Sequence, residues 1–215
     1  MESRELLSAT FGSAVSFGND TGNTNAFDMT MDGAGNSYVT GSFVGTVDFD
    51  PGATHAGDTD ILTSNESGDV YIAKYAPDNS LVWVQRMGGG TSDLTAACRS
   101  IEIDGSGNVY VVGEFKGNSD FGTTTLTATG DADGFVAKLN ASGMVQWAKS
   151  WGTIAEDRGR GVGVDASGNV YAIGFRMNDA RTILKFSATG AAVWSKSIAT
   201  HDTNVSTDLV VSANG

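Results

Sequence analysis

The sequence predicts an all-β chain made of repeated units, each a four-stranded antiparallel sheet. Three observations predict this fold class. A turn motif, Asp-x-x-Gly-Asn-x-Tyr, occurs three times. Each copy is followed by a strand-length segment that contains a lysine and then, at a constant spacing, by a tryptophan. Glycine accounts for 29 of the 215 residues and proline for only 2, a composition rich in turns. Recurrence of this kind is typical of repeat architectures.

The turn motif joins the first two strands of each unit. First strands are expected over residues 26–31, 100–103 and 161–164, and second strands over 37–43, 109–115 and 170–175. Aspartate caps backbone amides, whereas glycine and asparagine tolerate the left-handed backbone of a tight turn. We interpret the motif residues as structural rather than as ligands, because all of them recur at turn spacing: Asp32, Gly35, Asn36, Tyr38, Asp104, Gly107, Asn108, Tyr110, Asp165, Gly168, Asn169 and Tyr171.

A second hairpin completes each unit. Third strands are expected over residues 70–75, 134–139 and 182–186, with their lysines on the solvated side, and fourth strands over 81–86, 144–149 and 191–196. The fourth strands carry Trp83, Trp147 and Trp194. An indole could stack on a sugar ring, but its fixed place in every unit favours a packing role.

Four antiparallel strands per unit, with an aromatic residue at a fixed place, predict blades of the β-propeller type. The expected boundaries are a partial strand and connector over 1–25, blades over 26–96, 97–158 and 159–206, and the start of a truncated fourth repeat over 207–215. Propellers close with about four to eight blades. About three full blades therefore predict either a piece of a longer propeller or a homo-oligomer that completes or caps one.

The motifs resemble those of the bacterial SBBP-type β-propeller repeat family. They read Gly35-Asn-Ser-Tyr-Val-Thr-Gly-Ser-Phe43 with Gly45-Thr-Val-Asp-Phe49, and Gly107-Asn-Val-Tyr-Val-Val-Gly-Glu-Phe115 with Gly117-Asn-Ser-Asp-Phe121. Phe135-Val-Ala-Lys138 and Trp147-Ala-Lys149 complete the pattern, whereas the third copy lacks the Gly-x-x-Asp-Phe element. The resemblance implies extracytoplasmic or surface-associated repeat proteins that serve as interaction platforms, and it implies no catalytic residues.

Charge and hydropathy narrow the classes of partner. The formal net charge is −12, and such a surface repels phosphate backbones, so nucleic acid is not expected as a partner. The apolar runs are no longer than a strand, which predicts no membrane span. The first residues lack the basic and apolar regions of a signal peptide, so the cellular location is left open by the sequence itself.

Acidic residues gather in the two longest connections. Oxygen ligands in flexible loops suit Ca²⁺, so Asp48 with Asp50, and Asp131 with Asp133, are candidate calcium ligands. Solvated loop charge is the alternative, since no complete calcium-loop motif is present. No other cofactor is predicted.

No catalytic constellation emerges from the remaining residues. His55 and His201 lie far apart in polar loops, and Cys98 is expected to be a small buried residue rather than a nucleophile. We expect a non-enzymatic module that binds a protein or glycan, or that forms a structural segment of a larger surface protein. The alternatives are a carbohydrate-active hydrolase or lyase that uses paired loop carboxylates, and a calcium-dependent glycan-binding module.

Overall fold

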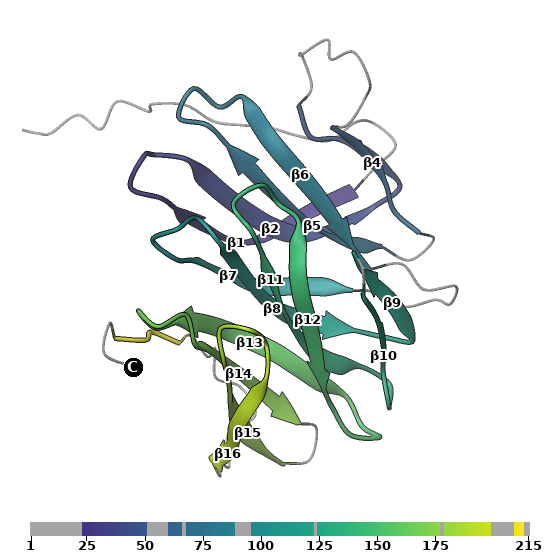
Figure 1. The fold of residues 1–215 in the computed structure, drawn as a ribbon. Coiled ribbons are helices and arrows are strands. Elements are labelled where there is room, and N and C mark those ends of the chain that lie inside the picture. The colour runs from purple at the N-terminus through teal and green to yellow at the C-terminus, as the bar shows by residue number, and fades with distance from the viewer. Residues whose placement is uncertain are drawn as a thin grey trace, which may run out of the picture.

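The computed structural model describes residues 23–50, 60–65, 68–88, 96–122, 124–176, 179–198 and 209–212. Over these residues the chain forms strands and turns without a helix, which confirms the all-β class. Three four-stranded antiparallel sheets lie in a row in chain order (Figure 1). No helix long and apolar enough to cross a membrane occurs within the described ranges.

Each sheet is a simple meander of four strands in chain order. The first contains β1 (Asn23–Met31), β2 (Ser37–Val44), β5 (Asp69–Tyr75) and β6 (Leu81–Met87). The second contains β7 (Ala97–Ile103), β8 (Val109–Phe115), β11 (Asp133–Leu139) and β12 (Val145–Trp151). The third contains β13 (Asp157–Val164), β14 (Val170–Arg176), β15 (Asp179–Phe186) and β16 (Ala192–Ile198). All twelve of these strands overlap the ranges expected from the sequence.

Two additional hairpins stand where the sequence suggested only long connections. The pair β3 (Thr46–Asp48) and β4 (Ile61–Thr63) follows β2, and the pair β9 (Asn118–Phe121) and β10 (Thr124–Thr127) follows β8. Both begin within the Gly-x-x-Asp-Phe element. They form because Val47, Phe49 and Phe121 are completely buried, so these segments belong to the core. In the third sheet β14 leads to β15 without such a hairpin.

The core lies between the sheets. Tyr38, Val70 and Ile72 of the first sheet form one apolar cluster with Val111 and Phe135 of the second. Another cluster joins the second sheet to the third, through residues such as Tyr110, Val136 and Leu184. The middle strands β8 and β11 are consequently buried on both faces, and their sequences read as nearly continuous apolar runs.

A β-bulge interrupts the first strand of every sheet at the same place. The register shifts between Ala26 and Asp28, between Cys98 and Ser100, and between Gly159 and Gly161. The extra residues are Phe27, Arg99 and Arg160. A bulge redirects a side chain out of the alternating pattern of the strand, so these three residues occupy equivalent special positions.

Candidate functional site

The aspartate of each turn motif is the centre of a small hydrogen-bond network. In the second sheet, Asp104 Oδ1 accepts hydrogen bonds from the backbone amides of Ser106 and Asn108, at 2.9 and 3.0 Å. Its Oδ2 accepts bonds from Asn108 Nδ2 at 2.7 Å and from the Tyr110 hydroxyl at 2.9 Å. Both carboxylate oxygens are thus used to hold the turn, which is the structural role that the sequence suggested for Asp104.

The other two turns repeat the same network. Asp32 accepts from Asn36 and Tyr38, and Asp165 accepts from Asn169 and Tyr171. The glycines of the motif have left-handed backbones, with φ of 86° at Gly35 and 77° at both Gly107 and Gly168. A side chain at these positions would strain the turn, which explains why glycine recurs there.

These hydrogen bonds favour the ionised carboxylates. The side-chain amide of Asn36 is the main cause of the lowered pKa of Asp32, and Asn169 has the same effect on the pKa of Asp165. At Asp104, burial is the largest single effect and raises the pKa. The hydrogen bonds from Asn108, Tyr110 and Ser106 together outweigh it, so the pKa of Asp104 is lowered as well. A general acid at neutral pH needs the opposite shift.

Tyrosine, lysine and tryptophan lie side by side across three strands on one face of each sheet. We name this arrangement the Tyr–Lys–Trp face. It consists of Tyr38, Lys74 and Trp83 in the first sheet, Tyr110, Lys138 and Trp147 in the second, and Tyr171, Lys185 and Trp194 in the third. We expected these lysines to lie on the solvated side, and each of them is partly exposed. The Nζ atoms of Lys74, Lys138 and Lys185 lie 5.0, 5.2 and 4.7 Å from the centroids of their tyrosine rings, because the ring face attracts the cation.

The Tyr–Lys–Trp face of one sheet meets the turn between the third and fourth strands of the next sheet. Trp83 Nε1 donates a hydrogen bond of 3.1 Å to the carbonyl oxygen of Ala141, and Trp147 Nε1 donates one of 3.2 Å to that of Ala188. Each indole also lies against a glycine of that turn. A Cβ added to Gly143 would come within 2.8 Å of the Trp83 ring, and one added to Gly190 within 2.7 Å of the Trp147 ring. We call this arrangement the indole–turn joint.

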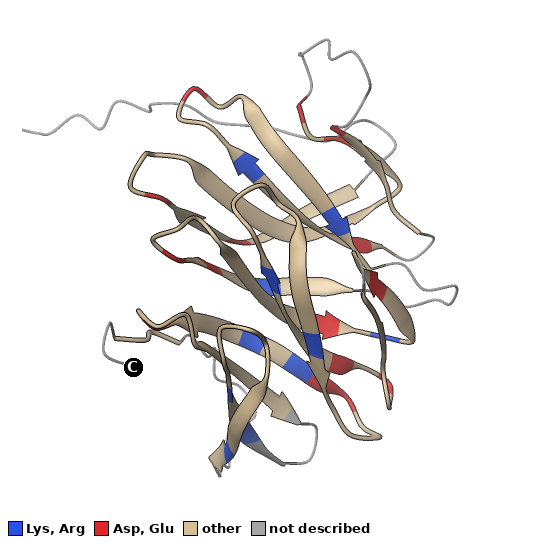
Figure 2. Ribbon diagram, viewed as in Figure 1, with Lys and Arg blue, Asp and Glu red and all other residues tan. Residues whose placement is uncertain are grey.

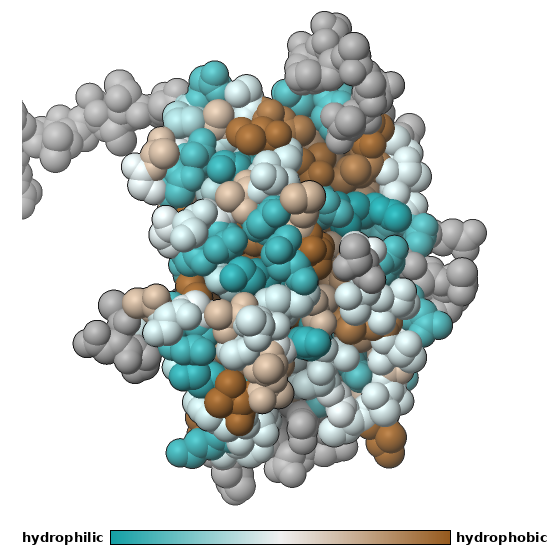
Figure 3. Space-filling model, in the orientation of Figure 1, coloured by the Kyte–Doolittle hydropathy of each residue, from teal (hydrophilic) through white to brown (hydrophobic). Residues whose placement is uncertain are grey.

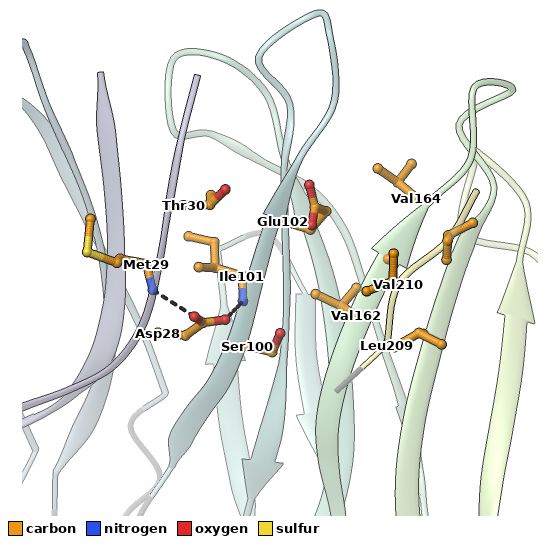
Figure 4. A pocket seen from close by; sticks show the side chains of 12 residues that line it. Asp28, Met29, Thr30, Ser100, Ile101, Glu102, Val162, Val164, Leu209 and Val210 are labelled. Atoms are coloured by element: carbon orange, nitrogen blue, oxygen red, sulfur yellow. Dashed lines mark hydrogen bonds between the residues drawn. The ribbon is translucent and has the colours of Figure 1, made fainter. Parts of the chain in front are cut away.

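A pocket lies where the first strands of the three sheets converge. Its volume is about 420 Å³, and residues 209–211 close it on the fourth side. Figure 4 shows Asp28 bridging two sheets, with Oδ1 accepting from the Met29 amide at 2.8 Å and Oδ2 from the Ile101 amide at 2.9 Å. Glu102 adds a second carboxylate, while Val162, Val164 and Leu209 make the opposite wall apolar.

The bulge residues form a second feature along the first strands. The Arg99 guanidinium lies 4.6 Å from the Phe27 ring and pairs with Glu114, while that of Arg160 lies 5.2 Å from the Phe175 ring. Burial lowers the pKa of Arg160; Glu114 works against this effect, whereas Arg99 and Arg158 add to it. Figure 2 shows basic segments on β13, where Arg158 and Arg160 stand. The sequence analysis did not single out the bulge residues Phe27, Arg99 and Arg160, although each precedes its turn aspartate by the same number of residues.

The candidate calcium ligands lie in two different settings. Asp48 ends β3, and its Oδ1 accepts the backbone amide of Asp50 at 2.9 Å. Asp131 is exposed, whereas Asp133 is only 2% exposed, and Asp133 Oδ2 accepts the amide of Thr129 at 3.1 Å. The described residues contain no group of three or more acidic, histidine or cysteine side chains placed to hold a metal. A calcium site at these aspartates therefore stays a prediction.

Asp133 has a counterpart in the first sheet. Asp69 also begins a third strand, is buried, and accepts the amide of the residue four positions earlier, Asn65, at 3.0 Å. Both carboxylates lie close to a glycine that follows the fourth strand, Gly88 or Gly152. This shared geometry indicates that Asp133 caps the preceding connection, as Asp69 does.

Cys98 is completely buried, as expected, and burial raises the pKa of its thiol to about 12. The protonated thiol is a poor nucleophile. His55 and His201 lie outside the described residues, as does the expected partial strand up to residue 22.

No protein-family model matches the chain, and no curated protein matches it at a significant level.

Proposed function

We propose that the chain is a β-propeller-type repeat module of the SBBP kind, and that it acts as a non-enzymatic interaction or structural element. The observation that carries the proposal is the recurrence of the indole–turn joint. The same tryptophan and the same turn connect the first sheet to the second and the second to the third. In repeat proteins each unit is stabilised by its contact with the next unit, and the indole–turn joint is such a contact.

The use of the repeated polar residues supports the same interpretation. The carboxylate oxygens of the turn aspartates accept hydrogen bonds from neighbouring amides and tyrosines, and the lysines lie over the tyrosine rings. Their recurrence is therefore explained by the stability of each unit. The hairpins β3–β4 and β9–β10, which differ between the sheets, and the pocket at the first strands are the surfaces that would contact a protein or glycan partner.

We further propose that copies of the chain associate, because a row of apolar sheets leaves hydrophobic surface at its ends. Met29 and Met31 of β1 are each 57% exposed, and Val193 of β16 is 53% exposed. Figure 3 shows hydrophobic surface over the third sheet, near β15 and β16. By the resemblance to the SBBP family, the setting would be extracytoplasmic or at a cell surface.

Light scattering coupled to size exclusion tests the self-association. The expected result is a mass above the 22.2 kDa of one chain that rises with protein concentration. A mass of one chain at every concentration up to the solubility limit would contradict the self-association. Screening of the same sample against immobilised glycans and candidate protein partners tests the interaction role.

A further inference from the structure

The pocket at the first strands is built from positions at which the repeats differ. Two places in each first strand bear on it, four and two residues before the turn aspartate. The first two sheets hold Asp28, Thr30, Ser100 and Glu102 at these places, whereas the third holds Gly161 and Gly163. The turn motif and the Tyr–Lys–Trp face keep the same residue types in all three sheets. The requirements of the common unit therefore do not account for the residues around the pocket.

Glycine in β13 makes room for the fourth wall of the pocket. A Cβ added to Gly163 would lie 2.5 Å from Val211 Cγ2, and one added to Gly161 would lie 3.2 Å from the Leu209 backbone nitrogen. Residues 209–211 can lie against β13 because these side chains are absent. The resulting cavity of about 420 Å³ has described residues on all four sides, and it is of the size that small-molecule sites have.

Hydroxyl groups on the polar side of the pocket lack partners in the described chain. Ser100 lines the pocket and is only 7% exposed, yet its hydroxyl forms no hydrogen bond with any residue that the structure describes. The half-buried Thr30 hydroxyl, which also lines the pocket, forms none with a described residue either. Buried hydroxyls in folded proteins normally have a partner, so one that faces a cavity indicates a bound water or ligand. Figure 4 shows both side chains at the cavity.

Carboxylates add negative charge and further acceptors to this side. Each carboxylate oxygen of Asp28 accepts one backbone amide, and such an oxygen has two lone pairs. Glu102 is the second carboxylate, and its Oε1 accepts the Ile103 amide at 3.2 Å. No lysine or arginine is among the described residues that line the pocket, and the whole chain has a net charge of −12. The pocket therefore favours a cation that donates several hydrogen bonds.

The other wall of the pocket selects among cations. Val162, Val164 and Leu209 present aliphatic side chains, which suit an apolar stem (Figure 4). A bare metal ion is less suited, because the described residues contain no group of three or more acidic, histidine or cysteine side chains placed to hold one. A sugar is also less suited, because the described lining residues include no aromatic ring on which it would stack.

From these observations we infer that the pocket binds a primary ammonium group on an aliphatic stem, which is the chemistry of a lysine side chain or a free alkylamine. The ammonium has three N–H donors, and Asp28, Thr30 and Ser100 provide acceptors for them. The stem lies against the valines and Leu209. The inference rests on the interaction role proposed above, and it names the ligand of one of the proposed surfaces.

The test is a titration of the full-length, ¹⁵N-labelled chain with n-butylammonium chloride, followed by amide chemical shifts. Saturable shifts are expected at the amides of Met29 and Ile101, because both donate to Asp28. Ammonium chloride keeps the charge without the stem, and n-pentanol keeps the stem without the charge. Each should bind about tenfold more weakly or less tightly still. Sodium chloride at the same concentration controls for ionic strength.

A second ligand distinguishes the two sources of the ammonium group. N-acetyl-lysine methylamide carries a lysine side chain on a capped, uncharged backbone. If it binds at least as tightly as n-butylammonium, the inference is supported with a lysine of a partner protein as the source. If only n-butylammonium shifts the pocket amides, the inference is supported with a free amine as the source.

Three variants connect the binding to the pocket. Ser100→Ala removes a hydroxyl that has no partner among the described residues, so the fold should be unchanged while binding weakens about threefold to tenfold. Asp28→Asn keeps an oxygen acceptor but loses the charge, and it should weaken binding about tenfold or more. Asp120→Asn is the matched control, since it makes the same change at an exposed aspartate of β9 outside the pocket, and binding should not change. The amide spectrum of each variant reports whether it is folded.

The outcomes separate this inference from the assembly role. Absence of saturable shifts, equal binding of n-pentanol, or unchanged binding in folded Ser100→Ala would overturn the inference. Shifts of the same amides with Ca²⁺ and not with either amine would overturn it in favour of a metal. A chain that binds no amine but still self-associates loses this ligand and keeps the assembly role. A monomeric chain that binds the amine through Ser100 keeps the ligand and loses the self-association.

Discussion

The second and third sheets share one half of their architecture and differ in the other. Both have the aspartate turn and the Tyr–Lys–Trp face. Only the second adds a hairpin and an aromatic triad, in which the Phe121 ring lies 4.8 Å from Phe135 and 5.7 Å from Phe115. The first sheet repeats this triad with Phe43, Phe49 and Tyr71 at almost identical separations, the closest being 4.9 Å.

In the third sheet, a threonine occupies the place of the central ring. Thr182 pairs with Gly174 as Phe135 pairs with Gly113. Its side chain is buried, and among the described atoms its hydroxyl has no hydrogen-bond partner. The end of the unit that carries the aspartate turn and the tryptophan recurs in all three sheets and joins successive sheets, whereas the opposite end differs between the sheets.

The largest expected effect is at the triad. Phe135→Ala should lower the free energy of unfolding by about 3–5 kcal/mol, since it removes a completely buried ring and leaves a cavity. Thr182→Ala, the equivalent change in the third sheet, should cost much less because fewer buried atoms are lost. Urea denaturation measures both. Equal losses would show that the buried ring of Phe135 stabilises its sheet no more than Thr182 does, and would contradict the stabilising role of the triad.

The turn network should give a smaller effect that is shared between sheets. Asp104→Ala removes an acceptor of four hydrogen bonds and should cost about 1–3 kcal/mol. Asp165→Ala should also destabilise the chain if the turn end is uniform, and differential scanning calorimetry can compare the two. A loss confined to Asp104 would contradict the equivalence of the turns.

The same carboxylates should make stability depend on pH. The pKa values of Asp32, Asp104 and Asp165 are lowered in the folded chain, whereas an unfolded aspartate has a pKa of about 3.9. Their contribution is therefore complete above about pH 4 and is lost as the pH falls through the lowered values. The urea concentration at the unfolding midpoint should therefore decrease as the pH is lowered below about 4. The decrease should be less steep for Asp104→Asn than for the wild type. Equal slopes for the variant and the wild type would rule out a contribution from Asp104.

The smallest expected effect is at the threonine that replaces the central ring in the third sheet. Thr182→Val replaces a buried hydroxyl that has no partner among the described atoms, and the new side chain has nearly the same shape. Stability should rise by up to about 1 kcal/mol, read as a higher melting temperature. A fall would indicate that the hydroxyl is satisfied by a bound water.

Sequence reasoning reached the twelve sheet strands but missed both hairpins. The strands are predictable because the motif Asp-x-x-Gly-Asn-x-Tyr fixes a turn locally and recurs. The segment around Val47 and Phe49 is too short to show a period. Its strand character depends on burial against Tyr71 and Tyr75, which are distant in sequence. The contacts between the lysines and the tyrosine rings were missed for a similar reason, since they depend on the strand register.

Local sequence is sufficient to predict the unit, which has four strands, a capped turn and a tryptophan at a constant place. These features follow from local chemistry, in which aspartate, asparagine and glycine favour one turn and valine, tyrosine and phenylalanine favour strands. The contacts between the units are visible in the folded structure alone. In the folded structure, Trp83 and Trp147 contact the turns of the following sheets, and Arg99 lies over the Phe27 ring. Trp194 is exposed. Those contacts depend on how residues far apart in the chain pack together, and no local pattern encodes that packing.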